Sequence, residues 1–127
     1  MKILFIHRGF PGQFKWLLNK LISRGDHITA IIPKNSKISN TNVDFHYYEM
    51  ERGNGADTDP LAIEIETKVL RGRAVSKVAS RLKDCDYFPD LIIGHSGWGE
   101  CLFLNIVWPD AKLLYYIEYA YNIIGSD

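Results

Sequence analysis

The sequence predicts an α/β fold: a three-layer domain in which a mostly parallel sheet carries helices on both faces. Short apolar runs rich in Ile and Leu recur along the chain, and amphipathic helical patterns separate most of them. Glycine or proline marks the junctions. Crossover connections between parallel strands are right-handed. We therefore expect one Rossmann-like domain over residues 1–127, with its strands in the order 3-2-1-4-5.

The first strand–helix unit occupies residues 2–25. Residues 3–6 are apolar and rich in Ile and Phe, which is typical of a buried strand. Glycine and proline at positions 9, 11 and 12 end the run. An apolar stripe at helical spacing then follows, formed by Phe14, Leu17, Leu18, Leu21 and Ile22. Gly25 is suited to end this helix in a left-handed conformation, directly after the cation Arg24.

The next segment predicts two strands. Residues 28–32 are almost uniformly apolar, as in a strand covered on both faces, and Pro33 ends the run. Residues 43–48 alternate in polarity, which places this strand nearer the sheet edge. Its drier face consists of Val43, Phe45 and Tyr47, and its wetter face of Asp44, His46 and Tyr48.

A long helix is expected from Asp59 and Pro60 to about Lys83, because Asp is a favoured N-cap and Pro suits the first helical position. Its apolar stripe consists of Leu61, Ile65, Val69, Gly72, Ala79 and Leu82. Gly72 marks either a kink or a close contact with another segment. The basic residues of this helix, Arg71 among them, form either an anion-binding run or, as we prefer, a solvated face.

The last unit spans residues 91–117. A short buried strand at 91–94 precedes the turn at 95–100, which contains Gly97 and Gly99. A short amphipathic helix is expected next, with Leu102, Phe103, Ile106 and Val107 on its apolar side. Residues 113–117 form the last expected strand, which ends in Glu118.

Composition restricts the class of protein. The chain is 46% hydrophobic and 24% charged, and its 15 basic residues balance 15 acidic ones, so no net field favours nucleic acid or an anionic membrane. Cys85 and Cys101 lack metal-ligand spacing and suit a reducing compartment. Neither a signal peptide nor a membrane span is visible. We expect a cytoplasmic protein without a metal cofactor.

The turns after the first and fourth strands predict a ligand site. In a parallel sheet both turns reach the carboxyl edge, where open α/β folds bind ligands. Gly9 and Gly12 in one turn and Gly97 in the other would let backbone N–H groups and helix N-termini face an anion such as a diphosphate. The alternative is that tight turns simply need glycine. The dinucleotide fingerprint and the Walker loop are both absent from the sequence.

Several side chains at this edge are candidates for function. His95 would hydrogen-bond a sugar hydroxyl or a phosphate, unless neighbouring backbone satisfies it. Glu118 should be paired or face the cleft. Trp98 either forms a wall on which a sugar stacks, or packs in the core or in a lid. His7 is expected to pack against its turn or to cap it. Glu100 either acts in catalysis or, as we prefer, favours the start of its helix through the dipole.

Two motifs resemble the amino-terminal domain of glycosyltransferase family 4 (group 1). They are RGFPGQF at residues 8–14 and, more specifically, HSGWGE at 95–100 followed by WPDAKLLYYIEY at 108–119. The resemblance implies a GT-B enzyme, with two Rossmann-like domains across a cleft, that transfers a sugar from a nucleotide-sugar donor with retention and without a metal. The amino-terminal domain then supplies the side that binds a sugar or glycan acceptor.

The resemblance also implies roles for single residues. Gly9 and Gly12 match the loop near the donor diphosphate, and His95 matches a histidine that contacts the transferred sugar. We therefore assign His95 as catalytic and expect substrate or donor binding at Gly9, Gly12, Gly97 and Glu118.

The family's carboxyl-terminal nucleotide-binding domain is absent from these 127 residues. We expect the chain alone to have little or no activity, and the aromatic residues at 115–121 to face that domain. The alternative is a non-catalytic flavodoxin-like or receiver-like binding module, although a receiver needs acidic residues where His7 and Arg8 stand. The sugar, the acceptor and the oligomeric state stay open, as does a peripheral membrane contact.

Overall fold

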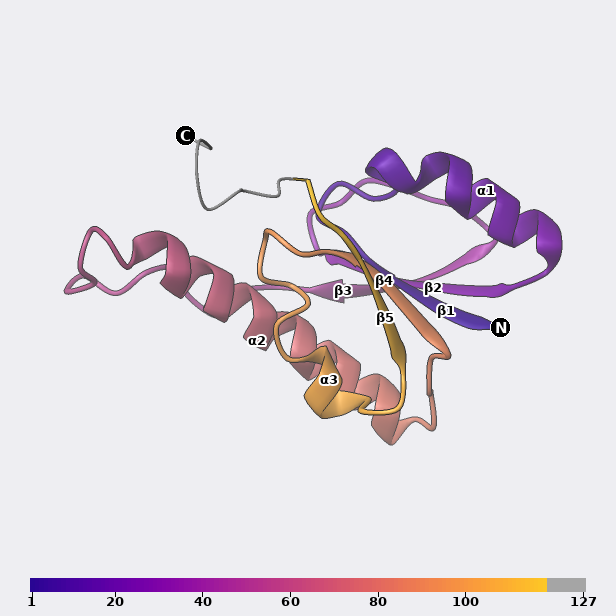
Figure 1. Cartoon of the computed structure of the whole chain (residues 1–127). Helices are drawn as coiled ribbons and strands as arrows, with labels where there is room; N and C mark the ends of the chain where they lie inside the picture. Colours follow the sequence, from indigo (N-terminus) through magenta and orange to yellow (C-terminus); the bar gives the residue numbers. More distant parts are fainter. Residues whose placement is uncertain (119–127) are drawn as a thin grey trace, which may run out of the picture.

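The predicted sheet forms. The computed structural model describes residues 1–118, and its five strands make one parallel sheet in the order β3-β2-β1-β4-β5 (Figure 1). The strands are β1 (Lys2–Ile6), β2 (His27–Pro33), β3 (Val43–Tyr48), β4 (Leu91–His95) and β5 (Lys112–Tyr116). The helical elements are η1 (Gly12–Phe14), α1 (Lys15–Arg24), α2 (Ile63–Asp84) and α3 (Leu104–Val107). The α/β class and the strand order are therefore confirmed.

Helices cover both faces of the sheet, α1 on one face and α2 with α3 on the other (Figure 1). Side chains alternate along a strand, so β1 sends Ile3 and Phe5 into the core beside α1 and Leu4 and Ile6 into the core beside α2. All of these side chains are fully buried. Each such burial contributes roughly 1.5–3 kcal/mol, so β1 forms the centre of both apolar layers.

The first helix ends as the sequence predicts. Gly25 adopts the left-handed conformation, with φ of +87°. Its amide donates to the carbonyl of Ile22 at 2.9 Å, and the amide of Asp26 donates to Leu21 at 3.1 Å. These bonds satisfy carbonyl groups that the helix leaves free at its carboxyl end.

The long helix starts later than predicted. Asp59 does not cap it, because the Asp59 side chain accepts a hydrogen bond from the amide of Leu61 and closes a turn before the helix. The helix proper begins at Ile63, with Ala62 as its N-cap residue. The Asp-Pro pair is thus a turn signal here, since Asp also favours local turns through its own side chain.

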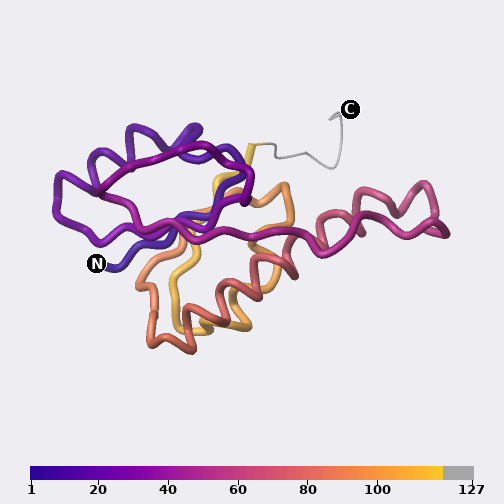
Figure 2. Tube along the Cα trace, turned by 180° about the vertical axis from the view of Figure 1, so that it is seen from behind, coloured from indigo at the N-terminus to yellow at the C-terminus, as the bar shows by residue number. Residues whose placement is uncertain are grey.

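The apolar face of α2 also differs from the predicted stripe. Leu61, in the turn before the helix, is 91% exposed, and Ile65, in its first turn, is 65% exposed, because this end of α2 projects past the carboxyl edge of the sheet (Figures 1 and 2). Burial begins at Leu70 and continues toward Leu82. Helical spacing identified the helix, but it does not report where the sheet beneath the helix ends.

Two shorter predictions need correction. On β3, Tyr47 is exposed and Tyr48 is buried, the reverse of the expected pattern, because the edge strand is covered beside Tyr48 by the α2 layer. The expected helix near Leu102 is a series of turns followed by the single helical turn α3, and Leu102 and Ile106 are exposed. The buried residues of this segment are Cys101, Leu104, Val107 and Trp108.

Gly72 marks a close contact, one of its two predicted meanings. A Cβ atom at this position would lie 2.6 Å from the carbonyl oxygen of Gly99, in the turn after β4. Gly99 itself has φ of +93°, and a Cβ there would lie 2.4 Å from the carbonyl oxygen of Lys68. Helix α2 and this turn therefore pack backbone against backbone.

We predict that Gly72→Ala lowers the free energy of unfolding by about 1–3 kcal/mol, as overpacking does elsewhere. Alanine favours a helix by about 1 kcal/mol over glycine, so a purely local effect would have the opposite sign. Ser80→Ala, on an exposed position of the same helix, is the control and should change the free energy little. Denaturant titration measures both, and a stabilised Gly72→Ala variant would contradict the close packing.

Candidate functional site

The turns after β1 and β4 lie side by side at the carboxyl edge of the sheet. β1 and β4 are direct neighbours, with Ile6 paired to Gly94 at the end of their register. Their next residues bring the rings of His7 and His95 to a centroid separation of 6.4 Å. The structure thus joins the two glycine-bearing turns that the sequence placed at one edge.

Both histidines hold their own turns in the same way. Nδ1 of His7 accepts a hydrogen bond from the amide of Gly9, and Nδ1 of His95 accepts one from the amide of Gly97, each at 3.0 Å. Both side chains are buried, with 3% of each residue exposed. Because Nδ1 is the acceptor, the neutral ring carries its proton on Nε2. Each turn therefore presents an imidazole whose Nε2–H is a donor.

The two Nε2 groups have different partners. Nε2 of His7 lies 3.0 Å from Oε1 of Gln13, and burial lowers the pKa of His7, which keeps its ring neutral. Nε2 of His95 lies 3.3 Å from Oε2 of Glu118. The geometry of that approach is not that of a hydrogen bond, and within residues 1–118 this buried nitrogen has no hydrogen-bond partner. His95 therefore holds an unused donor at the carboxyl edge.

Steric contact with the histidines explains two of the predicted glycines. A Cβ at Gly12, where φ is +48°, would lie 2.5 Å from Cε1 of His7. A Cβ at Gly97 would lie 3.1 Å from Cε1 of His95. Gly9 differs, because its Cβ position is 3.9 Å from the nearest side chain. Turn geometry alone thus accounts for Gly12 and Gly97, whereas Gly9 borders open space.

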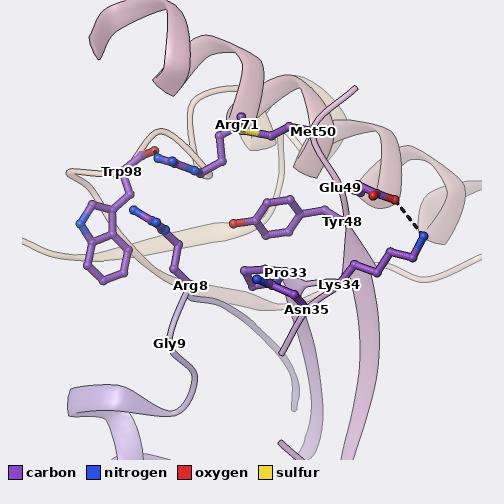
Figure 3. Close-up of a pocket in the computed structure, with 10 residues that line it drawn as sticks. All are labelled: Arg8, Gly9, Pro33, Lys34, Asn35, Tyr48, Glu49, Met50, Arg71 and Trp98. Atoms are coloured by element: carbon purple, nitrogen blue, oxygen red, sulfur yellow. Dashed lines mark hydrogen bonds and ion pairs between the residues drawn. The ribbon is translucent and has the colours of Figure 1, made fainter. Parts of the chain in front are cut away.

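That open space is a cavity of about 820 Å³ (Figure 3). It is lined by Arg8, Gly9, Pro33, Lys34, Asn35, Tyr48, Glu49, Met50, Arg71 and Trp98. Of the five predicted site residues, Gly9 lines it directly. His95 lies next to it, since its ring stacks on that of Trp98 at a centroid distance of 4.0 Å. Trp98 therefore separates His95 from the cavity.

Tyr48 and Glu100 form a buried pair behind the cavity wall. The Tyr48 hydroxyl donates to Oε1 of Glu100 at 2.9 Å, and Glu100 is 1% exposed. Burial raises the pKa of Glu100 and the pKa of Tyr48. The predicted dipole role of Glu100 is wrong, because α3 begins only at Leu104.

The sequence-based interpretation also missed Arg71. It belongs to the predicted solvated face, yet its Nη1 donates to the carbonyl oxygen of Trp98 at 2.5 Å. Helical spacing gave no signal for this contact, because its partner lies in a turn far along the chain. Tyr48 is an aromatic residue on the face of β3 that we expected to be wetter, and this was the available sign that this face is covered as well.

Residues 24–127 match the model of the glycosyl transferase family 4 group. The chain belongs to this family. The match includes His95 and its turn but begins after Gly9 and Gly12. The flavodoxin-like or receiver-like alternative is therefore not supported. No curated protein matches the chain.

Among solved structures, the family 4 chain is similar to the glycosyltransferase SsfS6 of Streptomyces sp. SF2575, whose crystal structure is a complex with thymidine diphosphate. The TM-score is 0.61 at 15% sequence identity. The likeness covers 92% of this chain and 38% of SsfS6, so the chain spans well under half of that enzyme's length. The fold is thus that of a glycosyltransferase-like domain of GT-B type.

In residues 1–118, no group of three or more His, Cys, Asp and Glu side chains is arranged to hold a metal ion. The helices in this part of the family 4 chain are all too short or too polar to cross a membrane.

We predict that Tyr48→Phe lowers the free energy of unfolding by about 1–3 kcal/mol, because it leaves a buried carboxyl group without its donor. Tyr47→Phe is a matched control, since Tyr47 is adjacent and 46% exposed; exposed substitutions change stability by about 0.5 kcal/mol or less. Chemical denaturation at pH 7 measures both variants. Equally small changes in the free energy of unfolding in both variants would show that the Tyr48–Glu100 hydrogen bond does not stabilise the cavity wall.

Proposed function

We propose that this family 4 chain is the amino-terminal, acceptor-side domain of a retaining glycosyltransferase. The enzyme would transfer a sugar from a nucleotide-sugar donor to a sugar or glycan acceptor. Family membership supports the reaction class. The thymidine diphosphate bound by SsfS6 supports a nucleoside diphosphate as the leaving group.

The buried Nε2–H of His95 is the observation that carries this proposal. An N–H donor without a partner is costly in an apolar setting, which favours a ligand that accepts from it. A hydroxyl oxygen of the transferred sugar is such an acceptor. His95 would orient the sugar and stabilise charge as the bond to the leaving group breaks. Glu118, whose Oε2 lies 3.3 Å from the same nitrogen, would contact the same substrate.

Gly9 would act by leaving room for the donor, because it borders open space. The amides of Gly9 and Gly97 already donate to the histidine rings, so these two N–H groups are not free for a diphosphate. Without side chains, however, the turns allow a ligand to approach the backbone closely. We therefore propose that Gly9, Gly12 and Gly97 border the donor. Electrostatic contact with the donor diphosphate would come from groups other than the amides of Gly9 and Gly97.

A second domain would complete the site. The chain spans 38% of SsfS6, and we propose a carboxyl-terminal nucleotide-binding domain as its partner across the cleft. Exposed side chains on β5, including Leu114, Tyr115 and Tyr116, support an interdomain surface there. Of the aromatic residues predicted for that surface, Tyr119 and Tyr121 lie outside the described residues. We propose that the 127-residue chain alone has little or no transferase activity.

The reaction would need no metal ion or other cofactor, with the nucleotide sugar as a substrate. We further propose a cytoplasmic location, which the free thiols of Cys85 and Cys101 support. Both proposals are open to direct test, by activity in excess chelator and by cell fractionation.

We predict that His95→Ala lowers the turnover number at least tenfold in the longer protein that joins this domain to its nucleotide-binding partner, since an orienting donor is lost. His27→Ala is the control, because His27 is exposed at the amino end of β2, opposite the carboxyl edge of the sheet. Product release from a nucleotide-sugar donor measures the rate, and NMR of the product reports the anomeric configuration. An unchanged rate in His95→Ala removes His95 from the mechanism, and inversion refutes the retaining class.

A further inference from the structure

Two arginines from separate elements reach the same part of the cavity. Arg8 follows β1, and Arg71 lies on α2. Figure 3 shows both guanidinium groups beside Trp98, in the space in front of the Tyr48 hydroxyl. Trp98 positions both of them: its carbonyl oxygen accepts from Arg71, and its ring centroid lies 5.7 Å from Cζ of Arg8. The two cations are therefore held together by one residue.

Neither guanidinium group is neutralised. Within residues 1–118, neither Arg8 nor Arg71 forms an ion pair with an acidic side chain. Lys34, the third cation of the cavity, is paired with Glu49 at 2.9 Å. Glu100 lies near both arginines, but it is buried, its Oε1 is bonded to Tyr48, and its pKa is raised by burial. The cavity thus holds two like charges whose repulsion an anion would relieve.

The arginines line a cavity that most of the expected donor contacts do not border. The cavity wall comes largely from the last residues of β2 and β3, Pro33 and Tyr48, and from the residues that follow each strand. Of the residues that we propose border the donor, Gly9 lines this cavity, whereas Gly12, Gly97 and His95 do not. An anion bound between Arg8 and Arg71 would therefore belong to the other substrate.

We propose that the acceptor carries an anionic group, a carboxylate or a phosphate, and that Arg8 and Arg71 bind this group together. This inference rests on the proposed function, because it names the acceptor class for the same cavity. The planar guanidinium group matches both anions through paired N–H donors. A sugar acid and a sugar phosphate present the same chemistry to the site. Asn35, which also lines the cavity, is available to a hydroxyl group of the same sugar.

The test is calorimetric titration of the 127-residue chain with D-glucuronate, D-glucose 6-phosphate, D-glucose and thymidine diphosphate. The variants are Arg8→Gln and Arg71→Gln. Arg73→Gln is the matched control, because it removes the same charge from an exposed position two residues along α2. Because Arg8 is exposed, we expect Arg8→Gln to fold. Its affinities decide the proposal even if Arg71→Gln fails to fold.

The proposal expects at least one anionic sugar to bind more tightly than D-glucose, with an affinity that falls at least tenfold in Arg8→Gln and Arg71→Gln and less than twofold in Arg73→Gln. Binding of D-glucuronate would identify the anionic group as a carboxylate, and binding of D-glucose 6-phosphate would identify it as a phosphate.

Three results would overturn the proposal. They are equal binding of D-glucose and both anionic sugars, absence of binding by both anionic sugars, and arginine-dependent binding of thymidine diphosphate alone. The last result would assign the arginines to the donor. None of these results removes the proposed transferase function, which fails separately if the longer protein does not turn over a nucleotide sugar.

Discussion

The hydrogen bond from a glycine amide to Nδ1 of the histidine two residues earlier sets the geometry of the carboxyl edge. It occurs after β1 at His7 and again after β4 at His95, at 3.0 Å in both turns. Each bond folds the chain back over a buried ring and fixes which ring nitrogen carries the proton. Because β1 and β4 pair directly, the two turns meet. A shared edge for both turns then follows from strand order alone.

The cavity depends on the second of these turns. Once His95 is fixed, Trp98 stacks on its ring with the two planes 9° apart. The carbonyl of Trp98 then anchors Arg71, and the next residue, Gly99, packs against α2 at Gly72. The turn therefore fixes the position of α2, which forms one wall of the cavity, relative to β4. The Tyr48–Glu100 bond closes the same wall from the side of β3.

Local patterns in the sequence were sufficient for the sheet and for its active edge. Apolar runs identified four of the strands and polarity alternation identified β3, and the expected strand order is the observed one. The start of α2 and the exposure of Leu61 were missed, because helical periodicity is the same on and beyond a sheet. The contacts of Tyr48, Arg71 and Glu100 were not predicted for a different reason: each residue finds its partner far along the chain, and only the folded chain brings them together. Family likeness drew attention to His95, but its unused Nε2–H is a property of the structure.

The protonated ring nitrogen of each buried histidine is the most direct test of this account. Long-range ¹H–¹⁵N correlation spectra of the ¹⁵N-histidine-labelled chain at pH 7.5 distinguish Nδ1–H from Nε2–H, with the exposed His27 as a reference. We expect Nε2, and not Nδ1, to carry the proton in the neutral ring of both His7 and His95. A proton on Nδ1 of His95 would break its bond to Gly97, remove the free donor from the edge and contradict the central claim.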